Sequence, residues 1–267
     1  MKITHKKVGL ALGSGAIRGF ALIGVLQALK EHEIPIDLIS GASSGAIVAA
    51  HYAVFQDANL LKEELLLSAK KNKLPSVLDL GLRGGLIKAE KVSNFLKQLF
   101  AKKTFLDTKI PLRIVTTDLV DGRPTFFSEG KLAFCVQASC AVPVIFEPIK
   151  YQGHCFVDGG LSDPVPVNIL KKMGADVVIA VNLYHKNEFI NRRFTLPKVA
   201  FRSSRIAIYN LAQASIKDAE VVINPDLSPF VTVSLKKHTN KKSFDEMIEL
   251  GYRETLKQIP KIKELLK

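Results

Sequence analysis

Two glycine-rich turns near the start of the chain constrain the fold more than any other feature, because each stands between a short apolar run and a helical stretch. The first unit consists of Val8–Leu12, Gly13-Ser14-Gly15 and the helical stretch Ala16–Lys30. The second follows Pro35 and consists of Ile36–Ser40, Gly41-Ala42-Ser43-Ser44-Gly45 and the small apolar residues Ala46–Ala53. A short apolar run, a tight turn and a helix, repeated in this order, are typical of a parallel sheet with crossover helices. The pattern predicts an α/β protein.

The rest of the chain continues this alternation. Helices are expected at Leu60–Lys71, Val92–Lys103, Val136–Ala141 and Phe244–Lys267, the last of them interrupted by Pro260. Strands are expected at Leu112–Thr116, Thr125–Phe127, Cys155–Val157, Val177–Leu183 and Val221–Asn224, with turns at Asp121-Gly122 and 151–154. Gly81–Gly85 is expected as a loop, and Glu188–Arg205 as a basic, irregular segment. Because no repeat or linker divides the 267 residues, we expect a single domain.

Composition excludes several classes of protein. Hydrophobic residues make up 47% and charged residues 24%, which excludes a mainly disordered, collagen-like or fibrous chain. No apolar run approaches the 18 residues of a transmembrane helix. The N-terminal residues resemble a signal peptide, but their apolar part is short and runs into glycines, so we interpret Val8–Leu12 as a first buried strand. Three cysteines, without a CxxC motif or a His/Cys cluster, favour a reducing compartment and offer no metal site. We therefore expect a cytoplasmic protein.

The positive charge is concentrated in two segments. The net charge is +13, with 11 Lys and Arg against 5 Asp and Glu in residues 61–110, and 16 against 9 in residues 181–267. A basic surface attracts nucleic acid or an anionic lipid surface. The two helices expected in residues 60–103 carry lysine opposite Leu65, Phe95, Leu96, Leu99 and Phe100. Such helices either lie in a membrane interface or pack their apolar faces on the sheet and turn lysine to water.

Ser43 stands at the centre of a Gly41-x-Ser43-x-Gly45 pattern between a strand and a helix. A nucleophilic serine needs a sharp turn that projects its hydroxyl, and glycines two residues before and after remove the bulk that would block that turn. The start of a helix also favours developing negative charge. The alternative is an ordinary strand-to-helix turn in which Ser43 is a helix N-cap.

The first glycine turn also has two interpretations. A dinucleotide loop would need glycine at position 18, where the chain has Arg18, and an acidic residue at the end of the second strand, whereas Asp37 stands at its start. The other interpretation is an oxyanion hole at a helix N-terminus. Its candidate residues are Gly13, Ser14, Gly15, Ala16 and Arg18.

A nucleophilic serine needs a base, and the six histidines are poorly placed to supply one. His51 is eight residues past Ser43, about 12 Å along the same helix, and the others lie in tails, turns or polar surroundings. Asp158 is the better candidate, since it ends an apolar strand before Gly159 and Gly160. Asp163 is second. The alternative is a plain Asp-Gly turn.

Taken together, these motifs resemble those of the patatin-like phospholipases in their compact bacterial form. Gly13–Gly19 is similar to the glycine-rich oxyanion motif of the family, with Ser14 in place of a common glycine, and Gly41–Gly45 is similar to its nucleophile elbow. A third block is Ala138-Ser139-Cys140-Ala141-Val142-Pro143 with Phe146 and Pro148, and a fourth is Asp158-Gly159-Gly160 with Asn168. The resemblance covers residues 8–183, with weaker similarity at Val221–Pro225 and Phe244–Tyr252. We expect residues 184–267 to pack on the same domain.

The resemblance implies a three-layer αβα sandwich around a mostly parallel sheet. It also implies a Ser43–Asp158 dyad without histidine, metal or cofactor, which hydrolyses a carboxylic ester in a lipid or lysophospholipid. Ser44 is a second serine at the elbow, but only Ser43 has the flanking glycine spacing. The alternatives are a catalytically silent lipid-binding or regulatory protein of the same fold and a dinucleotide-binding enzyme. Peripheral contact with an anionic membrane is a further expectation, and nucleic acid is not expected as a partner.

Overall fold

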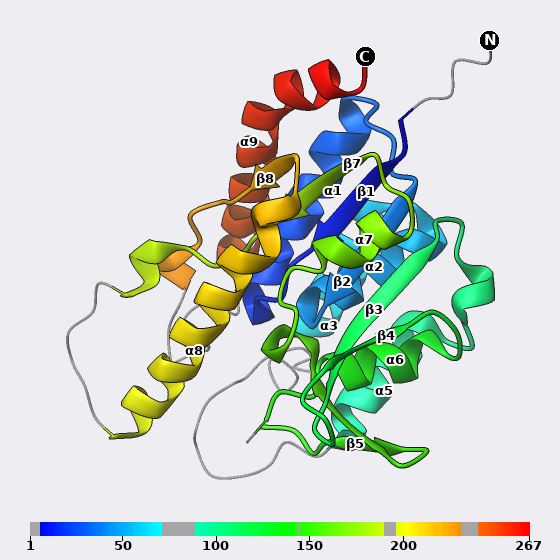
Figure 1. Cartoon of the computed structure of the whole chain (residues 1–267), viewed down its shortest axis with the longest axis vertical. Helices are drawn as coiled ribbons and strands as arrows, with labels where there is room; N and C mark the ends of the chain where they lie inside the picture. The colour runs from blue at the N-terminus through cyan, green and yellow to red at the C-terminus, as the bar shows by residue number, and fades with distance from the viewer. Residues whose placement is uncertain (1–5, 71–88, 144, 190–195, 231–239) are drawn as a thin grey trace.

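The computed structural model describes residues 6–70, 89–143, 145–189, 196–230 and 240–267 (Figure 1). Eight strands form one sheet in the order β5-β6-β3-β2-β1-β7-β8, with β4 paired to β3. The strands are β1 (Val8–Leu12), β2 (Leu38–Ala42), β3 (Leu112–Asp118), β4 (Pro124–Phe127), β5 (Ile149–Tyr151), β6 (His154–Asp158), β7 (Val177–Val181) and β8 (Val221–Ile223). The five strands β3-β2-β1-β7-β8 run parallel to their neighbours. The pairs β3–β4, β3–β6 and β5–β6 are antiparallel.

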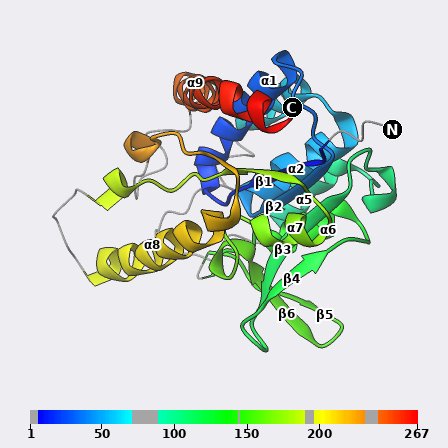
Figure 2. The ribbon, with the colours of Figure 1, turned by 45° about the horizontal axis from the view of Figure 1, so that its top comes forward.

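Helices cover both faces of the sheet (Figure 2). They are α1 (Phe20–Glu31), α2 (Ser44–Phe55), α3 (Ala58–Lys70), α5 (Ala89–Phe100), α6 (Leu132–Ser139), α7 (Val167–Lys172), α8 (Leu196–Ser215) and α9 (Lys241–Leu265). Successive side chains of β1 point to opposite faces: Leu10 and Leu12 join the core under α1, α2 and α9, and Ala11 joins a smaller core under α7 and α8. The expected three-layer αβα sandwich around a mostly parallel sheet is confirmed.

Two C-terminal predictions need correction. Glu188–Arg205 was expected to be irregular, but Glu188 lies in a 3₁₀ turn, Lys186–Phe189, and Arg205 lies in the 20-residue helix α8. Pro197 is compatible with that helix because it occupies the first turn, where backbone N–H groups have no intrahelical acceptor. The expected interruption at Pro260 does not split α9, which continues through it and bends near its end (Figure 1).

The position of β6 determines where the candidate site forms. Along β3, residues Leu112 to Val115 pair with β2 on one edge, while Thr116 to Asp118 pair with β6. Because β4 pairs across both stretches of β3, it takes the opposite edge, and β2 and β6 must share the remaining one. The two strands therefore meet end to end on β3, with Ala42 opposite Val115 and Asp158 opposite Thr116.

Helix α9 packs closely on α1, which follows the first glycine turn. Phe20 stacks on Phe244 with ring centroids 4.2 Å apart. A Cβ at Gly251 would lie 2.0 Å from the carbonyl oxygen of Ala21, so the two helix backbones approach as closely as glycine permits. The C-terminal helix thereby supports the N-terminal α/β unit.

Candidate active site

Ser43 occupies a strained position on a sharp turn between β2 and α2. It is the N-cap of α2 with φ 54° and ψ −120°, a conformation that a non-glycine residue adopts only when its surroundings hold it there. The turn is tight enough that a Cβ at Gly41 would lie 2.4 Å from the Gly45 oxygen, and a Cβ at Gly45 would lie 2.1 Å from the Leu12 oxygen. The glycines two residues before and after Ser43 are thus required by close backbone approach.

The hydroxyl of Ser43 donates a hydrogen bond of 2.6 Å to Asp158 Oδ2. The other carboxylate oxygen, Oδ1, accepts one from the Gly160 amide at 2.8 Å. Burial raises the pKa of Asp158 from 3.8 to about 6, and the bonds from Ser43 and Gly160 oppose that rise. Asp158 is therefore a carboxylate at neutral pH that binds a proton more readily than an exposed aspartate does.

Ser139 and Cys140, at the C-terminal end of α6, also contact Ser43. The sequence analysis gave these two residues no individual role. Ser139 Oγ accepts a hydrogen bond from the backbone N–H of Ser43 at 2.8 Å, and this bond fixes the elbow. The thiol of Cys140 adjoins Ser43, and burial together with the charge of Asp158 raises its pKa well above the ordinary value. Both residues belong to the third motif block, which was the signal available in the sequence.

The glycine-rich loop lies against the Asp158 motif. A Cβ at Gly160 would lie 2.7 Å from Ser14 Oγ, so the two loops are in contact. A Cβ at Gly159 would lie 2.2 Å from the Val115 carbonyl oxygen, so this residue passes closer still to the backbone of β3. The amide of Gly13 donates to Val181 O at 3.0 Å, and the amide of Ser14 donates to Pro164 O at 2.8 Å. These two amides are engaged in holding the loop.

The remaining loop amides are differently placed. No hydrogen bond of the Gly15 or Ala16 amide is formed with any part of the chain that the structure describes. The Arg18 side chain is buried, and its Nη1 donates to Leu183 O at 2.6 Å and to Glu188. Arg18 therefore braces the loop from within.

The alternative site residues lie elsewhere. The Asp163 side chain bonds with Ser215 of α8, and burial raises its pKa to about 6. Asp37 Oδ2 accepts from the Val8 amide at 2.8 Å, so it holds the amino ends of β1 and β2 rather than facing the glycine loops. His51 is buried in α2, with Nε2 2.9 Å from Glu64.

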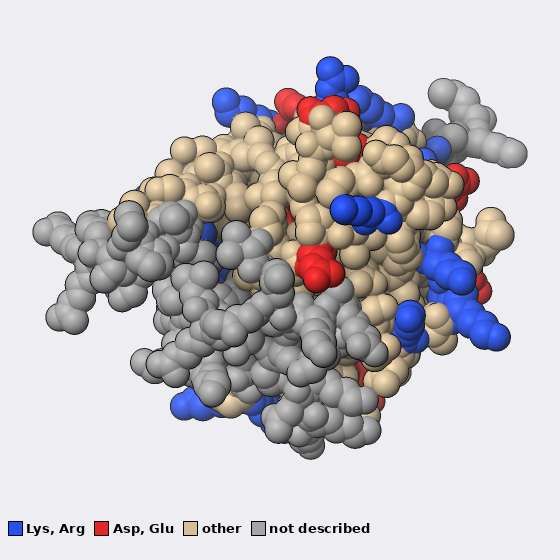
Figure 3. Space-filling model, turned by 90° about the horizontal axis from the view of Figure 1, so that it is seen from below, with Lys and Arg blue, Asp and Glu red and all other residues tan. Residues whose placement is uncertain are grey.

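In the described part of the basic segment, the apolar side chains that the sequence analysis named on α3 and α5 face the protein interior. Leu65, Phe95, Leu96, Leu99 and Phe100 are all buried in the main core, which is the second of the two packings considered for these helices. The expected loop at Gly81–Gly85 lies outside the described residues. On the face shown in Figure 3, the described Lys and Arg side chains lie in several separate groups. Membrane contact through charge stays a prediction.

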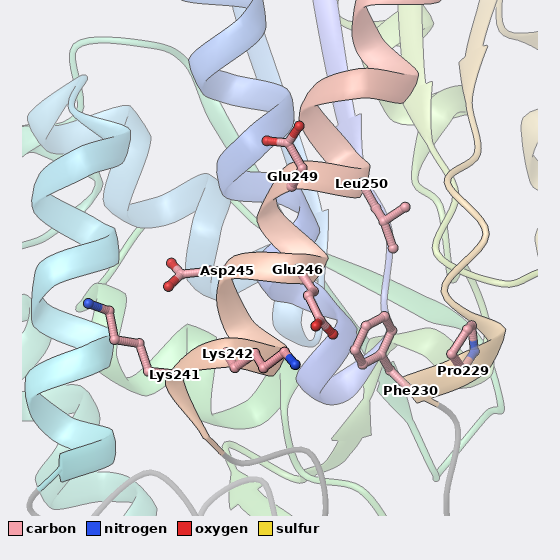
Figure 4. Close-up of a pocket in the computed structure, with 8 residues that line it drawn as sticks. All are labelled: Pro229, Phe230, Lys241, Lys242, Asp245, Glu246, Glu249 and Leu250. Carbon is pink, nitrogen blue, oxygen red and sulfur yellow. The ribbon is translucent and has the colours of Figure 1, made fainter.

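A groove of about 940 Å³ lies beside the N-terminal turns of α9 (Figure 4). Phe230 and Leu250 form its apolar wall, and Lys241, Asp245 and Glu249 are among the charged residues around it. Neither Ser43 nor Asp158 lines it. Among the residues that the structure describes, no helix is long and apolar enough to cross a membrane, and no group of three His, Cys, Asp or Glu side chains could hold a metal ion.

Ser43 lies on a glycine-flanked turn at the carboxyl end of a parallel strand and faces a buried carboxylate, which is the geometry that nucleophile elbows of α/β proteins have. Residues 10–171 match the family model described as patatin-like phospholipase. The chain belongs to the patatin-like phospholipase family.

Named relatives share parts of the chain. An uncharacterized NTE family protein of Mycobacterium tuberculosis is 35% identical over 180 residues, which is 66% of this chain and 49% of that protein. The human patatin-like phospholipase domain-containing protein 6 is 31% identical over 191 residues, 70% of this chain and 14% of that protein. Lysophospholipase nte1 of Aspergillus terreus is 28% identical over 296 residues, 98% of this chain and 19% of that protein. The chain thus spans about half or less of the length of these relatives.

The fold is also shared with a solved structure. The crystal structure of VipD from Legionella pneumophila superposes with a TM-score of 0.56 and 16% sequence identity, over 96% of this chain and 67% of that one. At this identity the likeness concerns the fold.

Proposed function

We propose that the protein is a serine hydrolase that cleaves carboxylic esters of phospholipids or lysophospholipids. The observation that carries the proposal is the 2.6 Å hydrogen bond from Ser43 Oγ to Asp158 Oδ2 on a strained, glycine-flanked elbow. Membership in the patatin-like phospholipase family supports the lipid class of substrate, and a relative named lysophospholipase supports the lysophospholipid.

In the proposed reaction, Ser43 Oγ attacks the acyl carbon of the ester, and its proton passes to Asp158. The bond between the acyl carbon and the ester oxygen then breaks, and Asp158 returns the proton to the departing alcohol. Water attacks the acyl-serine, gives a proton to Asp158, and releases the fatty acid as Ser43 Oγ recovers that proton. A carboxyl group with a pKa of about 6 suits both halves of this cycle better than one at 3.8, because its proton affinity lies nearer to neutrality.

The negative oxygen of the tetrahedral intermediate needs hydrogen-bond donors. The Gly13 and Ser14 amides are engaged with Val181 and Pro164, so we assign the oxyanion hole to the Gly15 and Ala16 amides of the first loop. The Ser44 amide, in the first turn of α2, has no acceptor within its helix and joins them. Arg18 is assigned a supporting role, since its guanidinium is engaged inside the protein.

Labelling with a fluorophosphonate probe tests the nucleophile. We expect the wild type to be labelled on Ser43, Ser43→Ala to be unlabelled, and Ser44→Ala to be labelled, because the Ser44 hydroxyl is buried and packs on Gly19. A panel of phospholipids, lysophospholipids and short-chain esters then identifies the substrate, with Ser43→Ala as the background. Labelling that persisted in Ser43→Ala and vanished in Ser44→Ala would exclude the assignment. A wild type that bound lipid without hydrolysing any ester would favour the catalytically silent alternative.

A further inference from the structure

Three charged side chains from distant parts of the chain meet inside the protein beside the glycine-rich loop. Glu188 belongs to the turn Lys186–Phe189, and its side chain is fully buried. Its Oε1 accepts hydrogen bonds from Arg18 Nη1 and, at 3.0 Å, from the His185 amide, while Oε2 accepts one from Arg205 Nη2 of α8. Burial alone would raise the pKa of Glu188, but the charges of the two arginines outweigh it and hold the pKa below its ordinary value.

Arg18 in turn fixes the peptide bond between Gly15 and Ala16. The Nε and the backbone N–H of Arg18 both donate to the Gly15 carbonyl oxygen, each at 3.2 Å. In a trans peptide the C=O and the N–H point in opposite directions, so holding the Gly15 oxygen also sets the direction of the Ala16 N–H. Ala16 has φ 52°, a left-handed conformation that an alanine keeps only when the loop around it is held.

Tyr184 connects the same charged group to the neighbouring residue of the loop. The guanidinium of Arg18 lies 4.6 Å from the centroid of the Tyr184 ring, and that of Arg205 lies 6.0 Å from it. The Tyr184 hydroxyl and Ser14 Oγ are 3.0 Å apart and share a hydrogen bond. Two side-chain hydrogen bonds therefore hold the loop, one from Arg18 to Gly15 and one between Tyr184 and Ser14.

Stability alone is a weak reason to bury this group. Taking an ion out of water costs several kcal/mol even in a real protein, and apolar residues of similar volume often serve folding as well as a buried ion triad. Fixed geometry is the property that charged hydrogen bonds supply and apolar contacts do not, because their donors and acceptors are directional. Such geometry matters for an oxyanion hole, where a displacement of about 1 Å can cost on the order of 10²-fold in rate.

We propose that Glu188 and Arg205 are positioning residues for the oxyanion loop, an inference that rests on the proposed function. Arg205 anchors Glu188 from α8, Glu188 holds Arg18, and Arg18 orients the Ala16 N–H toward the site of charge development. Glu188 is bonded to Arg18 and Arg205, whereas the Ser43 hydroxyl and the Asp158 carboxylate are bonded to each other and to the Gly160 amide. Both residues therefore act on the rate of acylation without altering the Ser43–Asp158 pair.

The test measures how fast and how completely a fluorophosphonate labels Ser43 in the full chain. The variants are Glu188→Gln, Arg205→Gln and the conservative Arg205→Lys. The matched control is Arg253→Gln, which removes an exposed arginine paired with Glu249 on α9. We expect Glu188→Gln and Arg205→Gln to slow labelling by about 10- to 100-fold at full final labelling. Arg205→Lys recovers part of the rate, and the control matches the wild type. With a short-chain ester, kcat falls while KM stays within about 2-fold.

The outcomes separate a positioning role from a structural one. A variant that was partly unfolded would show a smaller labelled fraction with an unchanged rate constant for the rest, and that result would overturn the proposal. Equal rate constants in wild type and Arg205→Gln would overturn it as well. A wild type that was not labelled at all would instead refute the proposed function, so the two failures are distinguishable.

Discussion

The raised pKa of Asp158 predicts a pH dependence that can be measured in two independent ways. Only the carboxylate can accept the Ser43 proton, so kcat/KM and the labelling rate should rise with pH to a plateau, with a midpoint of about 6. About one tenth of the protein would carry ionised Asp158 at pH 5, and about nine tenths at pH 7.

The same rise in the pKa of Asp158 makes the free energy of unfolding fall with increasing pH, whereas activity is expected to rise. A carboxyl group whose pKa is higher in the folded than in the unfolded state stabilises the fold at low pH, and this contribution is lost as pH rises from about 4 through 6. Raising the pKa from 3.8 to about 6 corresponds to about 3 kcal/mol at most. Asp158→Asn removes the titrating group and keeps an acceptor for the Gly160 amide. It should therefore be inactive, yet up to about 3 kcal/mol more stable than the wild type at pH 8, with little gain at pH 4.

Asp163 provides the control, because its pKa is also about 6 while its side chain bonds with Ser215 rather than with Ser43. Labelling rates from pH 4.5 to 9 are compared for wild type and Asp163→Asn, and urea unfolding at pH 4 and pH 8 for wild type and Asp158→Asn. A midpoint near 4 would refute the reasoning, as would one near 6 that disappeared in Asp163→Asn.

Three further predictions concern other parts of the chain. Burial lowers the pKa of His51 from 6.5 to about 4, so its contribution to the free energy of unfolding is present above pH 6.5 and is lost as pH falls toward 4, by about 3 kcal/mol. His51→Gln should lose this pH-dependent component in urea unfolding. An unchanged pH profile in this variant would contradict burial as the cause. Gly251→Ala would place a Cβ 2.0 Å from the Ala21 oxygen and should destabilise the fold by about 1–3 kcal/mol in urea unfolding, whereas the exposed Lys261→Ala on the same helix should change little. The pKa of the Cys140 thiol is raised well above its ordinary value, so iodoacetamide should alkylate it slowly at pH 7.5, as followed by mass spectrometry; alkylation as fast as that of a free thiol would refute this.

The elements that sequence analysis predicted are those whose signals are local. Both glycine turns stand between an apolar run and a helix, and both strands of these units are fully buried in the structure. Helix α8 was missed because the side that it turns to the sheet is only partly apolar. Ala212 is buried and Ile208 packs against the smaller core, but Arg205 and Ser215 share that side at helical spacing.

The sequence predicted which loops meet at the candidate site, but it did not predict the hydrogen bonds between them. The motifs identify the residues that meet, yet the engagement of the Gly13 amide depends on Val181, and that of Arg18 depends on Glu188, both about 170 residues away. The same holds for Ser139, which fixes the Ser43 amide from another element. Contacts of this kind are set by the tertiary fold, so spacing along the chain does not predict them.

Because β2 and β6 both pair with β3, the register of these two strands on β3 sets the positions of Ser43 and Asp158 relative to each other. Side chains alternate along a strand, so a slip of β6 by one residue would turn the Asp158 side chain to the opposite face of the sheet and leave Val157 or Gly159 in its place. Thr116 Oγ1 bonds Val157 O at 2.7 Å, and Thr117 Oγ1 bonds Asp158 O at 2.8 Å, and both bonds oppose such a slip. Insertions at the tip of the β5–β6 hairpin leave this register intact, whereas a single residue inserted between Cys155 and Asp158 destroys it. The length of this short segment should therefore tolerate no change, while the hairpin beyond it is free to vary.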